Sequence, residues 1–284
     1  MKILITGSYG QLGSELRQIL QQYADIQAFF TDVDTLDICN CDEVMRFFAE
    51  NQPDFVINCA AYTAVDKAEN DVDLCYKINC YAVENLALAA KKIGAKIIHI
   101  STDYVFDGTS SVPYKEDATV CPKSVYGKSK AEGEKKLMEN NPQNSIIIRT
   151  SWLYSVFGNN FVKTMLRLGK EREQISVVCD QIGTPTNAAD LAEAIVKIIL
   201  ANNFVSGVYH FSNEGVCSWY DFTKAIFEIK NISCDVLPIE SSQYPVPAPR
   251  PYYSVLNKSK IKTVFNLKIP YWKESLKNVL SNVK

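Results

Sequence analysis

Two side chains that together can transfer a proton, Tyr126 and Lys130, stand four positions apart in the sequence. In a helix this spacing places the phenol and the ammonium on one face. Thr102 precedes them, at the end of an apolar segment that is typical of a strand. A tyrosine can give the proton that a ketone takes up when a hydride adds to it, while a threonine hydroxyl holds the carbonyl oxygen. The sequence therefore predicts a carbonyl reductase with Thr102, Tyr126 and Lys130 as catalytic residues.

This chemistry requires that the pKa of the Tyr126 phenol falls. Lowering a phenol pKa from about 10 to about 7 takes roughly 4 kcal/mol of differential stabilisation. One cation at about 5 Å, in an effective dielectric near 20, supplies about 3 kcal/mol. We therefore expect Lys130 and the positive charge of an oxidised nicotinamide to lower the pKa of Tyr126. We also expect Lys130 to anchor the nicotinamide ribose.

The same Tyr-x-x-x-Lys spacing occurs again at Tyr220 and Lys224. In a chain with 15 tyrosines the spacing alone is weak evidence. Only the copy at Tyr126 follows a strand that ends in Thr102, so we interpret Tyr220 as a half-buried aromatic residue on a helix.

A glycine-rich loop lies between the first predicted strand and the first predicted helix. Gly7 permits a tight turn, Gly10 lets the backbone approach a pyrophosphate, and Gly13 lets the helix pack closely on the strand. Asp32 ends the second predicted strand, where a carboxylate binds the adenosine ribose and repels a 2′-phosphate. These residues predict a site for NADH or NADPH, with NADH slightly preferred.

The elements that carry these residues alternate as in a doubly wound α/β fold. Short apolar segments predict strands, and a periodicity of three to four residues predicts helices between them. The predicted strands are 2–6, 26–31, 55–58, 96–101 and 145–150, and the predicted helices are 11–22, 42–50, 74–93 and 124–139. Parallel strands end at one edge of a sheet, so Thr102 and the glycine loop should meet there.

Beyond residue 150 the pattern is less regular, with helices expected at 160–169, 187–201 and 218–229 and strands at 174–178 and 207–211. Residues 1–150, with the sheet extended by about 172–212, are predicted to form a Rossmann-type NAD(P)-binding domain. Residues 151–171 and 213–284 are predicted to form a smaller α/β substrate-binding lobe. The proline-rich segment 244–251 should be an ordered loop near that lobe.

Composition narrows the class of protein. The chain has 284 residues, 47% of them hydrophobic, which suffices for a substantial core. A net charge of -2 predicts no nucleic-acid partner. The sequence contains no apolar run of about 18 residues, so we predict no membrane-spanning helix. The first apolar segment is too short for a signal sequence. Nine cysteines without a Cys-x-x-Cys pair predict neither a zinc site nor disulfides, so we assign no metal ligands and expect a cytoplasmic location.

Longer motifs around these residues resemble a known family. They are TGSYGQLG at 6–13, NCAAYTAVDKAE at 58–69, STDYVFDG at 101–108, YGKSK at 126–130 and RTSWLY at 149–154. The chain resembles, over nearly its whole length, the extended short-chain dehydrogenases and among them the dTDP-4-dehydrorhamnose reductases. This resemblance implies reduction of the 4-keto group of dTDP-4-dehydro-L-rhamnose, a dTDP-linked 4-keto-6-deoxyhexose, to give dTDP-L-rhamnose.

The resemblance also implies which residues form the site. Those that bind the cofactor are Gly7, Tyr9, Gly10, Gln11, Leu12, Gly13, Asp32, Asp37, Ile38, Ala60, Ala61, Tyr62, Thr63, Tyr126 and Lys130. Those that bind the substrate are Thr102, Asp103, Tyr104, Trp152, Asn160 and Arg250. Arg250 is the candidate for the diphosphate, because a guanidinium binds phosphate oxygens through two hydrogen bonds. Ser8 and Tyr9 replace the small residue and Asn expected in the loop, which affects contacts on the adenine side.

Some members of this family form Mg²⁺-bridged dimers through acidic residues, and Glu15 falls in the corresponding region. The resemblance therefore allows Mg²⁺ and a homodimer. Without a metal, Glu15 is an ordinary carboxylate in the first turn of a helix, where the helix dipole favours it.

Three related functions are alternatives. A nucleotide-sugar dehydratase or epimerase shares the fold, but the dehydratases carry Thr-Asp-Glu where this chain has Thr102, Asp103 and Tyr104, so the second acid is missing. A reductase of another nucleotide-linked 4-keto-deoxysugar stays open, because base recognition belongs to the irregular lobe. A non-catalytic regulatory subunit also stays open, since relatives of the family bind methionine adenosyltransferase.

Overall fold

The computed structural model describes residues 1–201 and 203–283. The strands are β1 Lys2–Thr6, β2 Gln27–Phe30, β3 Phe55–Asn58, β4 Lys96–Thr102, β5 Ser145–Thr150, β6 Leu153–Tyr154, β7 Gln174–Val178, β8 Ile182–Gly183, β9 Thr186–Asn187, β10 Gly207–His210, β11 Cys217–Ser218 and β12 Asp235–Ile239. The α-helices are α1 Gln11–Leu20, α2 Cys41–Asn51, α3 Val65–Ala68, α4 Val72–Tyr76, α5 Ala82–Ile93, α6 Val125–Asn140, α7 Phe161–Glu171, α8 Ala188–Leu200, α9 Trp219–Lys230, α10 Ser259–Phe265 and α11 Trp272–Asn282. A π-helix, η1, covers Lys77–Tyr81, and short 3₁₀ turns cover Asp103–Val105 (η2), Pro142–Asn144 (η3) and Ser241–Gln243 (η4).

The central sheet has six strands in the order β10-β5-β4-β3-β1-β2, and all neighbours are parallel. The chain moves from β1 outward to β2 and then returns to the other side of β1 to form β3. The strand order therefore reverses beside β1, and ligands of such sheets bind outside the carboxyl ends of the strands at that position. The predicted doubly wound α/β fold is confirmed.

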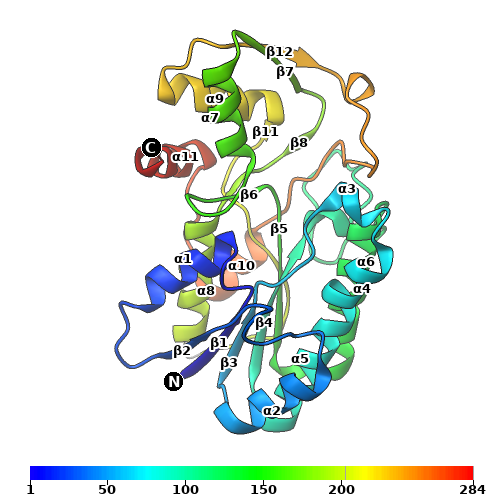
Figure 1. Ribbon diagram of the computed structural model, residues 1–284, viewed down its shortest axis with the longest axis vertical. Coiled ribbons are helices and arrows are strands. Elements are labelled where there is room, and N and C mark those ends of the chain that lie inside the picture. Colours follow the sequence, from blue (N-terminus) through cyan, green and yellow to red (C-terminus); the bar gives the residue numbers. More distant parts are fainter. Residues whose placement is uncertain (202, 284) are drawn as a thin grey trace.

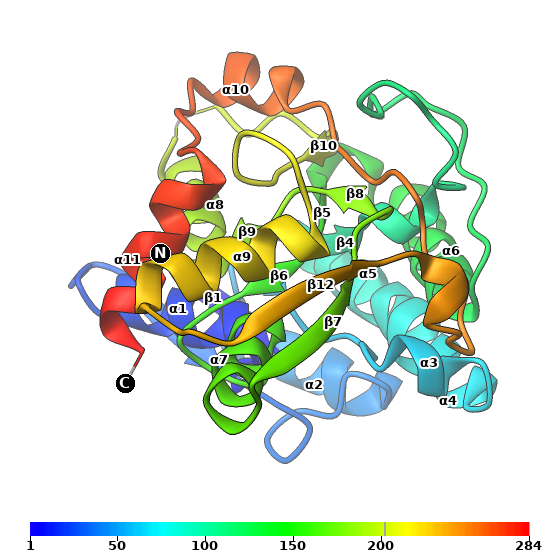
Figure 2. The same cartoon turned by 90° about the horizontal axis from the view of Figure 1, so that it is seen from above.

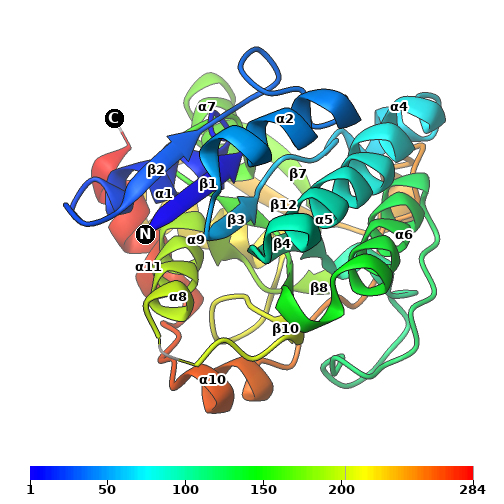
Figure 3. The ribbon, with the colours of Figure 1, turned by 90° about the horizontal axis from the view of Figure 1, so that it is seen from below.

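Successive residues of the central strands point to opposite faces and enter two separate cores. Leu4 of β1 and Val56 of β3 pack in the core formed with α2, α5 and α6. Ile3 and Ile57 pack on the opposite face with α1, α8 and α10. Figure 1 and Figure 3 show these two helical layers on either side of the sheet. Burial on both faces explains why the strands are almost continuously apolar.

A second, smaller lobe stands above the carboxyl edge of the sheet (Figure 1). Its core brings together α7, α9 and α11 with β7 and β12, including the buried side chains of Phe222, Ile226 and Leu276. Figure 2 shows β7 and β12 side by side, and they form a separate parallel pair. None of the described helices is long and apolar enough to cross a membrane.

Two segments lie elsewhere than the sequence predicted. The segment 172–212 was expected to extend the central sheet, but only β10 does so, because β7 pairs with β12 in the smaller lobe. Conversely α10, expected in the substrate lobe, buries Ile261 in the core beside the sheet. A strand pattern does not reveal its partner, because pairing depends on residues far away in the chain.

The predicted helix 74–93 is in fact three elements: α4, the π-helix η1 and α5. Asn79, fully buried in the π-helical turn, holds the loop after β3 through its side chain. Its Oδ1 accepts a hydrogen bond from Tyr62 N at 2.9 Å, and its Nδ2 donates to Ser129 Oγ at 3.1 Å. The π-helical turn therefore ties the loop after β3 to α6, and such turns are frequent at functional sites.

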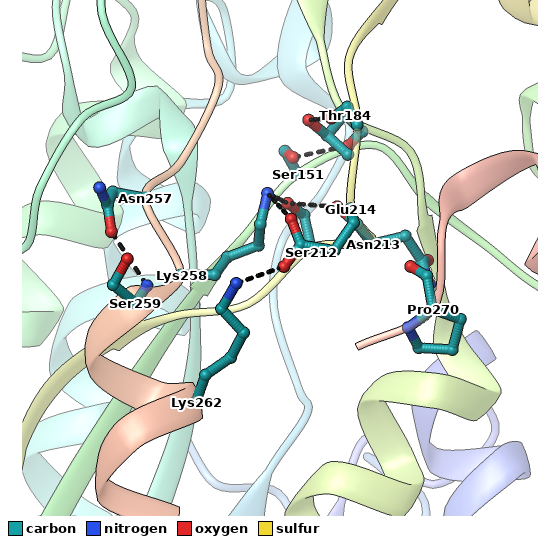
Figure 4. Close-up of polar contacts among 11 residues, drawn as sticks. Ser151, Thr184, Ser212, Asn213, Glu214, Asn257, Lys258, Ser259, Lys262 and Pro270 are labelled. Atoms are coloured by element: carbon teal, nitrogen blue, oxygen red, sulfur yellow. Dashed lines mark hydrogen bonds and ion pairs between the residues drawn. The ribbon is translucent and has the colours of Figure 1, made fainter. Parts of the chain in front are cut away.

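A polar junction joins the segment after β10 to α10 and to the start of α11 (Figure 4). Buried Lys258 approaches Ser212 Oγ at 3.4 Å and Glu214 at 3.7 Å, and Lys262 pairs with Glu214 at 2.6 Å. The backbone N–H of Glu214 donates to Pro270 O at 2.8 Å. Burial lowers the pKa of Lys258. These contacts fix the path of the chain between the sheet and the smaller lobe.

Candidate active site

A cavity of about 920 Å³ opens at the carboxyl edge of the central sheet, where the chain passes from β5 into the smaller lobe. Most of the predicted site residues line it: Gly7, Tyr9, Gly10, Gln11, Leu12, Gly13, Asp32, Asp37, Ile38, Ala60, Ala61, Thr63, Thr102, Asp103, Tyr104, Tyr126, Lys130, Trp152 and Asn160. Tyr62 and Arg250 are not among the lining residues. The structure therefore gathers the glycine loop and the catalytic candidates around one space.

The glycine loop is shaped so that only glycine fits at two of its positions. Gly7 has a φ of +64°, and a Cβ there would lie 2.6 Å from Ala60 N. A Cβ at Gly13 would lie 2.5 Å from the Cα of Ser8. Gly10 precedes α1 and offers no side-chain cap, so the first N–H groups of the helix stay free for an anion. This cradle fits the pyrophosphate of a dinucleotide.

The end of the cavity where the sequence predicts the adenosine carries the carboxylates of Asp32 and Asp37. Asp32 Oδ2 accepts a hydrogen bond from Tyr9 N at 3.0 Å, which fixes the carboxylate beside the loop. The exposed Tyr9 ring reaches over this end, and its hydroxyl donates to Asp34 at 3.3 Å. Tyr9 thus fills the place of the Asn expected there. Lys77, which sequence reasoning missed, also lines the cavity.

The three catalytic candidates come from β4 and α6. Ser124 caps α6 by accepting from Gly127 N at 3.1 Å, so the helix begins just before Tyr126. Lys130 is almost fully buried, and its Nζ donates to Ile100 O at 2.6 Å. The Thr102 hydroxyl lies at the end of β4, where it accepts from Tyr104 N at 3.2 Å. Sheet edge and helix start therefore place the three side chains at the same cavity wall.

The electrostatic environment of Tyr126 differs from the one expected. Burial raises its pKa above the ordinary value, the Thr102 hydroxyl acts in the opposite direction, and Asp103 raises it further. The predicted net fall of this pKa is therefore wrong for the protein groups alone, because desolvation of the phenolate outweighs the groups that lower it. The contribution of a positive nicotinamide stays a prediction. Burial also lowers the pKa of Lys130 to about 8, which Glu134 partly opposes.

Asp103 is a buried carboxylic acid in the cavity wall. Burial raises its pKa to about 6, while the hydroxyls of Ser254 and Thr102 act in the opposite direction. Its Oδ1 accepts from the Thr102 hydroxyl at 3.0 Å, but its Oδ2 has no partner among the residues that the structure describes. That oxygen can accept a hydrogen bond from a sugar hydroxyl.

Trp152 is held in an unusual backbone conformation. Its φ of +48° lies in the left-handed region, which is uncommon for a bulky residue. Its ring stacks on Trp219, with centroids 3.5 Å apart, and a Cβ on Gly183 would lie 2.6 Å from its Cε2. The smaller lobe therefore fixes Trp152 in the cavity wall. No local pattern in the sequence pointed to Trp219.

Asn160 and Gln11 connect the glycine loop to the smaller lobe. Asn160 Nδ2 donates to Gln11 Oε1 at 3.0 Å and to Ser155 O at 2.7 Å. Its Oδ1 accepts from Lys163 N at 3.1 Å and so caps α7. Asn160 thus has structural partners, and its contact with substrate stays a prediction.

Arg250 and Tyr62 have partners outside the cavity lining. The Arg250 guanidinium pairs with Asp66 at 2.7 Å and fastens the proline-rich loop to α3. Its contact with a diphosphate stays a prediction. The Tyr62 hydroxyl donates to Asp71 at 2.8 Å. Contact between the Tyr62 ring and a cofactor also stays a prediction.

Glu15 is not the first-turn carboxylate that the sequence predicted, because α1 begins at Gln11 and its first turn contains no acidic residue. It is 6% exposed, and its Oε1 accepts from Ser155 Oγ at 2.6 Å. Burial raises its pKa. The sequence pattern indicated that Glu15 lies on this helix but not that Ser155, 140 residues away in the chain, lies against it. Across residues 1–201 and 203–283, no group of three or more His, Cys, Asp or Glu side chains is arranged to hold a metal ion.

Sequence comparison decides the family. A sequence model of the family described as the RmlD substrate binding domain matches residues 1–284. The chain belongs to this RmlD family. It is 44% identical to the dTDP-4-dehydrorhamnose reductase of Aggregatibacter actinomycetemcomitans, over 98% of each chain.

Solved structures agree with the assignment to the RmlD family. The dTDP-4-dehydrorhamnose reductase of Clostridium acetobutylicum superposes with a TM-score of 0.95 at 47% identity, covering 99% of both chains. That of Bacillus anthracis, solved in complex with NADP, gives 0.94 at 44% identity over 99% of both chains. The predicted resemblance and fold class are therefore confirmed.

Proposed function

We propose that this chain catalyses the reduction of dTDP-4-dehydro-L-rhamnose to dTDP-L-rhamnose with NADH or NADPH. The observation that carries the proposal is one cavity lined by the glycine loop and by Thr102, Tyr126 and Lys130, in a chain of the RmlD family. Relatives at 44% identity named dTDP-4-dehydrorhamnose reductase support the choice of substrate.

The residues of the chain have separate tasks in this reaction. The bound nicotinamide cofactor supplies the hydride for C4 of the sugar. The Tyr126 hydroxyl gives its proton to the carbonyl oxygen, which the Thr102 hydroxyl holds in place. The charge of Lys130 stabilises the phenolate that remains, and a proton from solvent restores the phenol.

Each part of the fold contributes to binding in this proposal. The central α/β domain binds the cofactor through the glycine loop, Asp32, Asp37 and the segment 60–63. The smaller lobe and the cavity wall bind the sugar nucleotide through Asp103, Tyr104, Trp152, Asn160 and Arg250. The acidic adenosine end favours NADH slightly over NADPH. The proposal places the enzyme in the cytoplasm and allows a homodimer and a Mg²⁺ ion.

The test is an absorbance assay at 340 nm with enzymatically prepared dTDP-4-keto-6-deoxy sugar and each cofactor. We expect oxidation of NADH or NADPH that depends on this sugar. In Tyr126→Phe we expect most turnover to be lost while the Kd for NADH stays nearly unchanged, because only the proton donor is removed. Turnover only with a UDP- or GDP-linked sugar would change the substrate. No turnover with any keto-sugar would favour a binding subunit.

A further inference from the structure

A row of polar side chains crosses the buried central sheet directly beneath the cavity. Thr6, Asn58 and His99 occupy paired positions on β1, β3 and β4 and point to the face that α5 and α6 cover. The Thr6 hydroxyl donates to Asn58 Oδ1 at 2.7 Å, and the Asn58 amide meets His99 Nδ1 at 3.0 Å. All three side chains are buried, on the sheet face where the neighbouring strand residues Leu4, Val56 and Ile97 are apolar.

This row ends on the catalytic lysine. His99 Nε2 lies 3.3 Å from Lys130 Nζ, while the same ammonium donates to Ile100 O at 2.6 Å. His99 has no exposed surface, and burial followed by the charge of Lys130 keeps its pKa well below the ordinary value. His99 is therefore a neutral imidazole, with one N–H donor and one acceptor nitrogen.

The charge of Lys130 decides which nitrogen of His99 carries the proton. An ammonium can only donate, so His99 Nε2 must accept from it and the proton must lie on Nδ1. Nδ1–H then needs an acceptor, whereas the structure presents Asn58 Nδ2 to His99 and Oδ1 to Thr6. The same amide turned by 180° presents Oδ1 to His99 Nδ1–H and donates from Nδ2 to the Thr6 hydroxyl oxygen, so the inferred tautomer includes this reversed amide. The opposite tautomer would place an N–H of His99 against an N–H of Lys130. Only a neutral amine at Lys130 would permit that arrangement.

We infer that His99 is a positioning residue for Lys130: as the Nδ1–H tautomer it accepts a hydrogen bond from the ammonium. Together with Ile100 O, it fixes two of the three N–H bonds of Lys130, which leaves the third free to point into the cavity. Thr6 and Asn58 hold the imidazole in that tautomer. The catalytic role of this hydrogen bond rests on the proposed function, whereas the tautomer of His99 does not depend on it.

Other titratable groups near Lys130 act in known directions. Glu134 on α6 favours the charged ammonium, and so do the thiols of Cys59 and Cys75 when they ionise. Burial keeps the pKa of Cys59 at about 12 and also raises that of Cys75, so both thiols are neutral at pH 7. The local support for the charge of Lys130 thus comes from Glu134, Ile100 O and His99.

The first experiment needs no substrate. The chain has only 2 histidines, so ring ¹⁵N spectra of the histidine-labelled protein contain two sets of signals, which a His210→Gln sample assigns. We expect His99 to carry its proton on Nδ1 at pH 7. A proton on Nε2, or a charged imidazole, would overturn the inference while leaving the proposed function intact.

The second experiment uses the pH profile of kcat with NADH and the dTDP-4-keto-6-deoxy sugar. The fall of kcat at alkaline pH, the alkaline limb, should follow the loss of the proton from Lys130. His99→Leu removes one hydrogen bond from this buried ammonium, so the limb should move to a pH lower by about one to two units. His99→Gln, which restores an acceptor, should return the limb to within about half a unit of wild type. A merely structural role would lower kcat without moving the limb.

His210→Leu is the matched control. His210 is also fully buried on a strand and its pKa is also lowered by burial, but its Nδ1 contacts Tyr114 O rather than a catalytic group. We expect His210→Leu to lose stability without a shift of the limb. An equal shift in both Leu variants, or none in His99→Leu, would refute the role of His99. Absence of turnover in the wild type, with the Nδ1–H tautomer present, would refute only the proposed function.

Discussion

Gly7→Ala tests whether the glycine loop is tied to the cavity wall as tightly as the structure shows. The new methyl would lie 2.6 Å from Ala60 N, whereas ordinary contacts begin at 3.4 Å, so the backbone at Ala60 or the loop must move. The φ of +64° adds a conformational cost of about 1–2 kcal/mol for a non-glycine residue. Crowding in a packed site adds about 1–3 kcal/mol. We therefore expect a loss of about 2–5 kcal/mol in the free energy of unfolding.

Gly94→Ala separates the two contributions. Gly94 also has a positive φ, +73°, but a Cβ there would have no neighbour within 4 Å, and the residue lies at the end of α5 outside the cavity lining. It should lose only the conformational part, about 1–2 kcal/mol, and keep its affinity for NADH. Gly7→Ala should weaken NADH binding at least about tenfold, because Ala60 and the loop both line the cavity.

Urea unfolding and fluorescence titration with NADH measure these two quantities. The reasoning would be refuted if the two variants lost equal stability and Gly7→Ala bound NADH as the wild type does. That result would mean that the loop and the segment after β3 move apart without consequence for the cofactor site.

Three further perturbations follow from single contacts. The buried Arg149 guanidinium pairs with Glu134 at 2.7 Å, and Glu134→Gln removes its counter-charge. We expect the free energy of unfolding in urea to fall by about 3–5 kcal/mol, and a loss below about 1 kcal/mol would contradict this. Lys130 is charged below its lowered pKa of about 8, so kcat should fall as pH rises through that value; a flat profile from pH 7 to about 10 would exclude this dependence. Asp32→Ser removes a carboxylate from the adenosine end of the cavity. The ratio of kcat/KM for NADPH to kcat/KM for NADH should then rise about tenfold, and an unchanged ratio would show that Asp32 does not select the cofactor.

The sequence by itself determined the parts of this protein that depend on neighbours along the chain. Glycine spacing defines the loop, because Gly7 and Gly13 allow backbone contacts that no other residue permits. The four-residue interval between Tyr126 and Lys130 places both on one face of α6, whatever the rest of the fold does. Alternating strand and helix patterns likewise predicted the parallel sheet and the edge at which Thr102 lies.

Tertiary structure alone decided everything that depends on partners distant in sequence. It paired β7 with β12, engaged Arg250 with Asp66 and stacked Trp152 on Trp219. Desolvation is also a property of the whole fold, which is why the pKa of Tyr126 rises although a cation lies nearby in the sequence. His99 had one visible sign, a polar residue among isoleucines, but its meaning came from three strands and a helix meeting beneath the cavity.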